Sequence, residues 1–164
     1  VYAFEPILRN YLTFISLIFT HEVKNIVPFN MALSDGTKLL KMNEVKTSIR
    51  KKVLFNTYTA SKVHKEGSLI HYSTKLDDLK IKKKISFIKI DVEGHEMEVL
   101  RGAKNLVKRD KPVILIQDND KKVINYLKTW SYEQAKIKIK HGRKNYLFIH
   151  KKNMVVFLKS INKN

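Results

Sequence analysis

Residues 85–103 constrain the fold of this chain more than any other stretch. They open with the apolar, β-branched run ISFIKI at residues 85–90, which has the length and composition of a buried strand. An acidic loop containing Gly94 follows, and the apolar residues after it recur on one face of a helix: Val99, Leu100, Ala103, Leu106 and Val107. A strand that passes through a short loop into a helix is half of a parallel α/β unit. The sequence therefore predicts an α/β fold built around this strand.

Three ionisable side chains occupy the loop after the predicted strand: Asp91, Glu93 and His95. In open α/β sheets, ligands bind at the carboxyl ends of the strands, so these residues are the candidates for chemistry. His95 titrates near neutrality and could accept a proton, while Glu93 could orient it or join Asp91 in binding a cation. Each residue also has a structural interpretation. Asp91 could cap the helix, Glu93 could complement the helix dipole, and His95 could be a surface residue of the first turn.

The same stretch resembles a known family. IKIDVEGHE at residues 88–96, followed by EVLRGA at 98–103, is similar to the signature of the FkbM-type methyltransferases. Weaker landmarks occur in the family's order over roughly residues 1–150: VYAFEP at 1–6, NMALSD at 30–35, KLDDL at 75–79, KPVILI at 111–116 and KNYLFI at 144–149. The resemblance implies a Rossmann-like methyltransferase sheet, mostly parallel with antiparallel edge strands and incomplete at the N-terminus. It also implies methyl transfer from S-adenosylmethionine to a hydroxyl of a glycan, glycolipid or similar small molecule.

The resemblance also implies which residues bind the cofactor. Glu5 matches the glutamate that accepts hydrogen bonds from the ribose hydroxyls, and Pro6 follows it. Ala32, Leu33 and Ser34 match the residues that flank the adenine ring. The structural alternatives are a helix N-terminus that begins with an acid and a proline, and a plain strand-to-turn connection.

The positions of the acidic residues lead to one geometric expectation. Asp91, which would face the methionyl end of the cofactor or the acceptor, should share a crevice with Glu5 at the same rim of one parallel sheet. Lys89 stands in the predicted strand where a buried sheet favours an apolar residue. We therefore expect it to pair with an acid at the strand's end.

Two departures from the family pattern favour an alternative. The glycine-rich loop that holds the cofactor's methionine in this family is not found in residues 1–164, where the five glycines are isolated. The first strand and that loop would precede Val1. Gln117 stands where the family usually has a glutamate. An amide in place of that carboxylate removes its negative charge and its basicity. The alternative is a truncated, non-catalytic methyltransferase-like remnant or an interaction module.

Composition narrows the binding partners, metal sites and cellular locations that this chain could have. A net charge of +18 suits nucleic acid or an anionic surface, but only five of the 33 basic residues are arginine, so nucleic acid is the less favoured partner. There is no cysteine, and the histidines lack the spacing of metal ligands, so no metal site is predicted and the need for a divalent metal stays open. The longest apolar run, residues 11–19, is too short to span a bilayer. We expect a cytoplasmic protein, with peripheral membrane binding as an alternative.

The remaining patterns predict how the chain is organised. Residues 1–150 are expected to form the methyltransferase-like domain, and residues 151–164 a C-terminal extension in which residues 154–158 add an edge strand or pack as a tail. Residues 6–22 are apolar around most of the circumference of a helix and are expected to form a core helix, with a membrane-associated or partner-facing helix as the alternative. Residues 25–32 are expected to form one strand, with Pro28 at its start or at a bulge.

Overall fold

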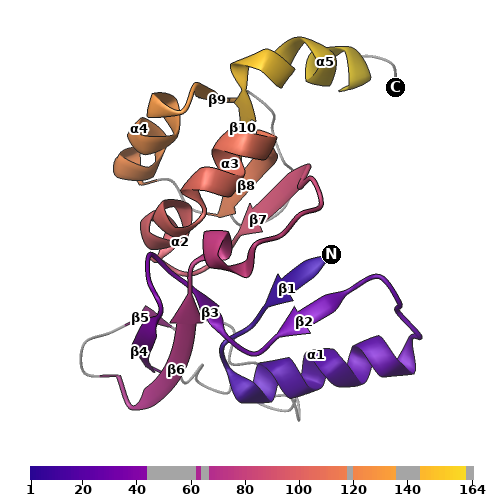
Figure 1. Cartoon of the computed structure of the whole chain (residues 1–164), viewed down its shortest axis with the longest axis vertical. Coiled ribbons are helices and arrows are strands. Elements are labelled where there is room, and N and C mark those ends of the chain that lie inside the picture. Colours follow the sequence, from indigo (N-terminus) through magenta and orange to yellow (C-terminus); the bar gives the residue numbers. More distant parts are fainter. Residues whose placement is uncertain (44–61, 64–66, 118–119, 136–144, 162–164) are drawn as a thin grey trace, which may run out of the picture.

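The structure is a computed structural model that describes residues 1–43, 62–63, 67–117, 120–135 and 145–161. The described residues form three hydrogen-bonded sheets and five α-helices (Figure 1). Mixed helices and strands, with parallel pairing in each sheet, confirm the predicted α/β class. The apolar patterns of residues 53–58 and 137–139 also predict short strands, and these residues lie outside the described part of the chain.

The first sheet pairs β1 (Tyr2–Phe4) with β2 (Val27–Phe29) in parallel, and α1 (Leu8–Thr20) connects them. The rings of Phe4 and Phe29 stack with centroids 5.0 Å apart. Pro28 is the central residue of β2, opposite Ala3, rather than its first residue. Its missing N–H costs nothing here, because Val27 and Phe29 make the hydrogen bonds to β1 and Pro28 faces the open edge.

The second sheet has the order β3-β6-β4-β5. Its strands are β3 (Ala32–Leu33), β4 (Lys38–Asn43), β5 (Lys62–Val63) and β6 (Leu69–Thr74). β3 runs parallel to β6, and the other pairs are antiparallel. The prediction of one strand over residues 25–32 is therefore wrong. The chain leaves β2 after Phe29, and β3 enters a different sheet.

The third sheet has the order β7-β8-β10-β9. It contains β7 (Phe87–Ile90), β8 (Val113–Gln117), β9 (Tyr132–Gln134) and β10 (Asn145–His150). β7 and β8 are parallel, while β10 is antiparallel to both of its neighbours. Parallel strands with antiparallel strands toward one edge match the expected sheet.

Three helices pack against the third sheet and form the main core with it. They are α2 (Glu96–Gly102), α3 (Lys104–Asp110) and α4 (Lys121–Thr129). The most enclosed apolar side chains of this core include Leu100, Val107, Ile114, Ile116, Leu127 and Phe148. Burial of each contributes about 1.5–3 kcal/mol to folding. Trp130, which ends α4, lies in this core 4.6 Å from the ring of Tyr126.

The KLDDL segment has a structural role. It forms the 3₁₀ helix η1 (Leu76–Leu79), and Asp77 accepts hydrogen bonds from the backbone N–H groups of Asn105 and Leu106, both at 2.9 Å. These groups begin α3, whose own N-cap residue, Ala103, has no capping side chain. Asp77 therefore caps α3 from another part of the chain.

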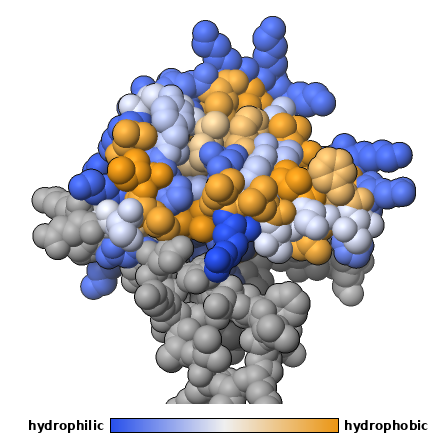
Figure 2. Space-filling view, turned by 90° about the horizontal axis from the view of Figure 1, so that it is seen from below, coloured by the Kyte–Doolittle hydropathy of each residue, from blue (hydrophilic) through white to orange (hydrophobic). Residues whose placement is uncertain are grey.

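Two helices differ from the predictions. None of the 13 side chains of α1 is buried, and Leu12 and Phe19 are 57% and 77% exposed, so α1 is not a core helix. On the face viewed from below, apolar and hydrophilic side chains lie beside one another (Figure 2). The second difference is α5 (Lys151–Ile161), a helix where an edge strand or tail was expected. A short apolar run does not distinguish these possibilities by itself.

Candidate functional site

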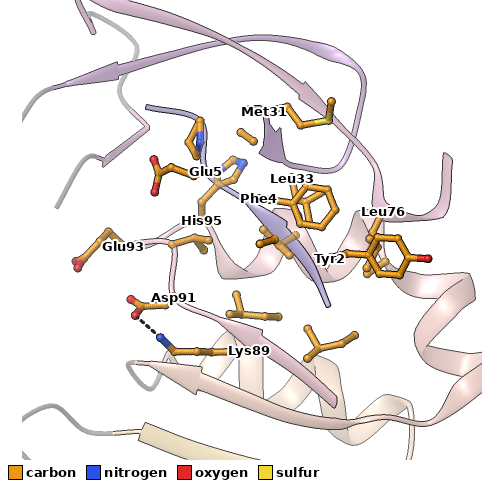
Figure 3. A pocket seen from close by; sticks show the side chains of 18 of the residues that line it. Tyr2, Phe4, Glu5, Met31, Leu33, Leu76, Lys89, Asp91, Glu93 and His95 are labelled. Atoms are coloured by element: carbon orange, nitrogen blue, oxygen red, sulfur yellow. Dashed lines mark hydrogen bonds and ion pairs between the residues drawn. The ribbon is translucent and has the colours of Figure 1, made fainter. Parts of the chain in front are cut away.

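A pocket of about 660 Å³ lies between β1 and β7, and we call it the β1–β7 pocket. Glu5, Asp91 and Glu93 lie toward one end of it, and Tyr2 and Leu76 toward the other (Figure 3). The expected crevice is therefore present, with the acidic residues at the same rim. The expectation of one continuous sheet is wrong, because β1 and β7 belong to separate sheets and no described strand pairs with both.

Glu5 is held at this rim by the start of α1. Its Oε1 accepts a hydrogen bond of 2.8 Å from the Ile7 N–H. Burial raises the pKa of Glu5 above its ordinary value, and hydrogen bonds from Ile7 and Asn10 partly oppose that rise. The structural interpretation of Glu5 thus has direct support, and it is compatible with cofactor binding. Pro6 also lines the pocket, but it precedes the N-cap of α1, Ile7, instead of occupying the first helical position.

The three residues predicted to flank an adenine ring separate in the structure. Ala32 and Leu33 line the β1–β7 pocket. Ser34 is fully buried behind it, and its Oγ lies 3.0 Å from His95 Nε2. Gly102 also approaches Ser34 closely: a Cβ on this glycine would stand 1.9 Å from the Ser34 carbonyl oxygen. Both ends of α2 therefore pack against Ser34.

The loop after β7 turns sharply before α2. Glu93 has a φ of 50° and Gly94 a φ of 99°, both in the left-handed region. That conformation is costly for a residue with a side chain, and such strain is often found at functional sites. The N-cap of α2 is His95, so the interpretation of Asp91 as a helix cap is wrong. Glu96 stabilises the loop by accepting a 3.0 Å hydrogen bond from the Gly94 N–H.

His95 is held between two protein groups. Its Nε2 contacts Ser34, and its Nδ1 lies 3.6 Å from Glu98 Oε2. The ring is 13% exposed, so it is not the surface residue of the structural alternative. Burial lowers the pKa of His95, and Lys38 lowers it further, while Glu98 works in the opposite direction. The Ser34 contact joins residues 61 positions apart, and no local sequence pattern indicates it.

Lys89 pairs with Asp91 as predicted. The Lys89 Nζ donates to Asp91 Oδ2 across 3.1 Å at the exposed rim of the pocket (Figure 3). Both side chains are about a third exposed or more, so the pair contributes little to stability, about 0–1 kcal/mol. Its main effect is to offset negative charge on one side of the acidic rim. Gln117 ends β8 and does not line the pocket.

Neither a metal cluster nor a membrane-spanning helix is found in the described part of the chain. Within it, no three acidic, histidine or cysteine side chains gather in a way that could hold a metal ion. None of the helices described has the length and apolar character needed to cross a bilayer.

The family model of the FkbM methyltransferase domain matches residues 1–136. The structure resembles the crystal structure of Methyltransferase FkbM from Methylobacillus flagellatus KT, with a TM-score of 0.62 and 19% sequence identity. The match covers 92% of this chain and 36% of that one, so this chain spans about a third of its length. At this identity the likeness supports the fold alone. No curated protein matches the sequence. The match to the family model extends over most of the sequence, and the chain therefore belongs to the FkbM methyltransferase domain family.

Proposed function

We propose that this chain takes part in methyl transfer from S-adenosylmethionine to a hydroxyl group of a glycan, a glycolipid or a similar small molecule. The observation that supports this most strongly is the gathering of Glu5, Asp91 and Glu93 at one rim of the β1–β7 pocket. Because the chain belongs to the FkbM methyltransferase domain family, methyl transfer is the reaction that we assign to this rim.

The residues at the rim fit the cofactor in their chemistry. Glu5 follows a strand and offers a carboxylate that can accept hydrogen bonds from ribose hydroxyls. Ala32 and Leu33 supply an apolar wall suited to a flat base. Asp91 and Glu93 provide negative charge that favours a sulfonium cation. When bound, S-adenosylmethionine supplies an activated methyl group.

The same residues of this chain can handle the acceptor's proton. A sugar hydroxyl is a weak acid, and a positioned base typically accelerates proton removal by about 10²–10⁴-fold. Asp91 and Glu93 are the carboxylates at the rim that could take that proton. His95 could do so only by giving up its contact with Ser34 or Glu98. We therefore propose that His95 acts as a positioning residue, which holds the loop against β3.

Calorimetric titration with S-adenosylmethionine tests this proposal. It should be made on residues 1–164 and on the same residues expressed with the sequence that precedes them in the gene. In whichever form binds, Glu5→Gln should weaken binding by about 10- to 100-fold, because a hydrogen bond to a charged group contributes about 1.5–3 kcal/mol. Glu22→Gln is the matched control, since Glu22 is exposed and does not line the pocket. Equal affinities of the Glu5 variant and the unmodified protein would rule out the role given to Glu5.

A non-catalytic interaction module is the second candidate. It is favoured by the isolated glycines of this sequence, because close backbone approach to a cofactor depends on glycine. It predicts no S-adenosylmethionine binding by either form of the protein. Measurable binding by either form would decide against it.

A further inference from the structure

We propose that the lysine-rich end of the third sheet is a docking surface for an anionic lipid bilayer. We call this surface the basic rim. Three segments form it: the loop of residues 82–86 that leads into β7, residues 108–112 at the end of α3, and residues 150–161, which include α5. The proposal concerns where the protein is held, and it does not depend on which reaction the β1–β7 pocket supports.

The topology of the third sheet brings the three segments to one end. β7 and β8 are parallel, so both strands begin there, and β10, which is antiparallel to β8, ends there. Helix α5 follows directly on the last residue of β10. Asp91 and Glu93 follow the carboxyl end of β7, so they lie at the opposite end of the sheet.

Hydrogen bonds hold the segments against one another. The Nη1 of Arg109, in the last turn of α3, donates to the Ile81 carbonyl at 2.9 Å. The side chain of Asn153 in α5 donates to the Lys111 carbonyl, also at 2.9 Å. The end of α3 therefore lies between the loop before β7 and helix α5, and the three segments form one surface.

Positive charge is concentrated on the basic rim. Its nine basic residues are Lys82, Lys83, Lys84, Lys108, Arg109, Lys111, Lys151, Lys152 and Lys159. Asp110 is the single acidic residue in the sequence of the three segments, and it pairs with Arg109 at 2.7 Å. Glu133 of the neighbouring β9 pairs with Lys151 at 3.3 Å. Nine basic against two acidic residues leave a net positive charge that attracts an anionic surface.

Helix α5 adds apolar side chains between its lysines. Four exposed residues share one face of this helix: Lys152, Val155, Val156 and Lys159. The side chains of Val155 and Val156 are 62% and 71% exposed. Asn153 lies on another side of the helix, where its hydrogen bond holds α5 to the domain. Exposed apolar side chains flanked by lysines suit a helix that lies in the interface of a bilayer.

Two features favour a bilayer over a nucleic acid. Arg109 is the single arginine in the three segments, and its guanidinium already donates to Asp110 and to the Ile81 carbonyl. Lysines act as flexible point charges, which suit a diffuse negative surface better than the directed recognition of phosphates and bases. The most exposed apolar side chains of α5 are valines, whereas unpaired bases stack on aromatic rings.

Docking at the basic rim would leave the candidate site accessible. Helix α5 lies on the far side of the third sheet from β1 and β2 (Figure 1). The acidic end of the β1–β7 pocket is at the carboxyl end of β7, away from the basic rim. The bilayer would therefore hold the protein without covering the pocket.

The first test measures binding of residues 1–164 to vesicles by co-sedimentation at about 0.15 M salt. Vesicles of equal parts phosphatidylcholine and phosphatidylserine are compared with vesicles of phosphatidylcholine alone. We expect binding to the anionic vesicles, with weaker binding as salt is added, and none to the neutral ones. Failure of the unmodified protein to bind the anionic vesicles, or equal binding to both kinds, would overturn the proposal.

Two charge-matched variants locate the docking surface. Combining Lys82→Gln, Lys83→Gln and Lys84→Gln should weaken binding by about 100-fold, because each lysine near an anionic surface contributes about fivefold. The control combines Lys24→Gln, Lys41→Gln and Lys121→Gln, which remove the same charge from exposed positions elsewhere. Far-ultraviolet circular dichroism checks that both variants are folded. Equal losses in the two variants would show attraction by net charge alone and would overturn the assigned surface.

A second measurement needs no change of charge. The chain has no cysteine, so Val156→Cys provides a single site for a dye whose emission depends on the polarity around it. Thr20→Cys is the control, because Thr20 is exposed at the end of α1. Anionic vesicles should shift the emission to the blue for the dye on α5 and leave the control unchanged. No shift on α5, or equal shifts at the two positions, would overturn the role of α5.

Competition with nucleic acid separates the two kinds of anionic partner. Single-stranded RNA and duplex DNA are each added to the protein bound to anionic vesicles. Retention on the vesicles, with the dye emission unchanged, supports the bilayer. Release by equal concentrations of phosphate groups on either nucleic acid would assign the basic rim to nucleic acid and overturn the proposal. The methyl donor is absent from all these measurements, so their failure is distinct from failure of the proposed function.

Discussion

Ser34 is the residue at which the candidate site is joined to the rest of the molecule. Gly102 packs against its carbonyl oxygen, and His95 contacts its hydroxyl. Because Ser34 follows β3 and its partners are the N-cap and the last residue of α2, this fully buried residue fixes the second sheet to the loop that carries Asp91 and Glu93. A small change at Ser34 or its partners should therefore alter both stability and the shape of the rim.

Gly102→Ala should destabilise the fold. The added Cβ would meet the Ser34 carbonyl at 1.9 Å, and backbone cannot move aside as a flexible side chain can. Overpacking of this kind costs about 1–3 kcal/mol and sometimes more. Gly36→Ala is the control, because nothing lies within 4 Å of the place that its added methyl group would take and its φ is not positive. Chemical denaturation of both variants measures the difference, and equal midpoints would contradict the described contact.

The free energy of unfolding should fall as the pH drops from about 8 to about 5.5. Burial lowers the pKa of His95 in the folded state, so the unfolded chain takes up a proton that the folded chain resists. His150, whose pKa burial also lowers, acts in the same direction. Glu5, whose pKa is raised, acts in the opposite direction at lower pH.

His95→Gln should make this pH dependence shallower, leaving the part due to His150. The measurement is thermal or denaturant unfolding at several pH values, with His21→Gln as the control because His21 is exposed. An unchanged slope in the His95 variant would show that the ring is not buried as described.

At the scale of elements, helices are stabilised by residues far away in the sequence. Helix α3 begins without a capping side chain of its own, and Asp77 in η1 accepts hydrogen bonds from two of its first N–H groups. This contact fastens the segment that leads into β7 to the helix that follows the candidate site. The KLDDL landmark thus has a physical role in the fold.

Asp77→Ala should cost about 1–2 kcal/mol, since it removes a cap and leaves backbone donors without their partner. Asp78→Ala is a close control, because Asp78 is exposed and its side chain forms an exposed ion pair of 3.8 Å with Lys75. Such surface pairs contribute about 0–1 kcal/mol. Urea denaturation distinguishes the two variants, and a larger loss at Asp78 would refute the capping role.

Local patterns predicted the elements around the site well. The strand β7, the acidic loop and the helix after it follow from a change of period within a few residues, and the pairing of Lys89 with Asp91 follows from a charge within an apolar run. The expectation that this strand is buried along its length is wrong, because in β7 only Ile90 is buried. Contacts between distant segments, such as Ser34 with His95, have no local signature. The exposure of α1 was missed because hydrophobicity shows what a helix could bury without showing whether a partner is there.

At the scale of the molecule, the described sheets differ in how many strands they contain and in how deeply those strands are buried. β8 lies between β7 and β10, and its Ile114 and Ile116 are 0% and 1% exposed. β1 and β2 form a sheet of two strands, and a pair of strands alone is marginally stable. The part of the chain around β8 should therefore be the most stable unit.

Amide hydrogen exchange of residues 1–164 should show this order. Exchange at Ile114 and Ile116 should be at least about a hundredfold slower than at Ala3 and Phe29, because local opening takes less free energy where fewer groups are buried. Comparable protection in β1 and β8 would mean that the two sheets unfold as one unit.

The single tryptophan gives this division a practical consequence. Trp130 lies in the core beside α4, against Tyr126, and does not line the β1–β7 pocket. Tryptophan fluorescence therefore observes the part of the protein that contains β8, and melting of β1, α1 and β2 could leave that signal unchanged. Circular dichroism in the far ultraviolet would register the loss of α1. A protein judged intact by its fluorescence alone could already have lost the strand that leads to Glu5.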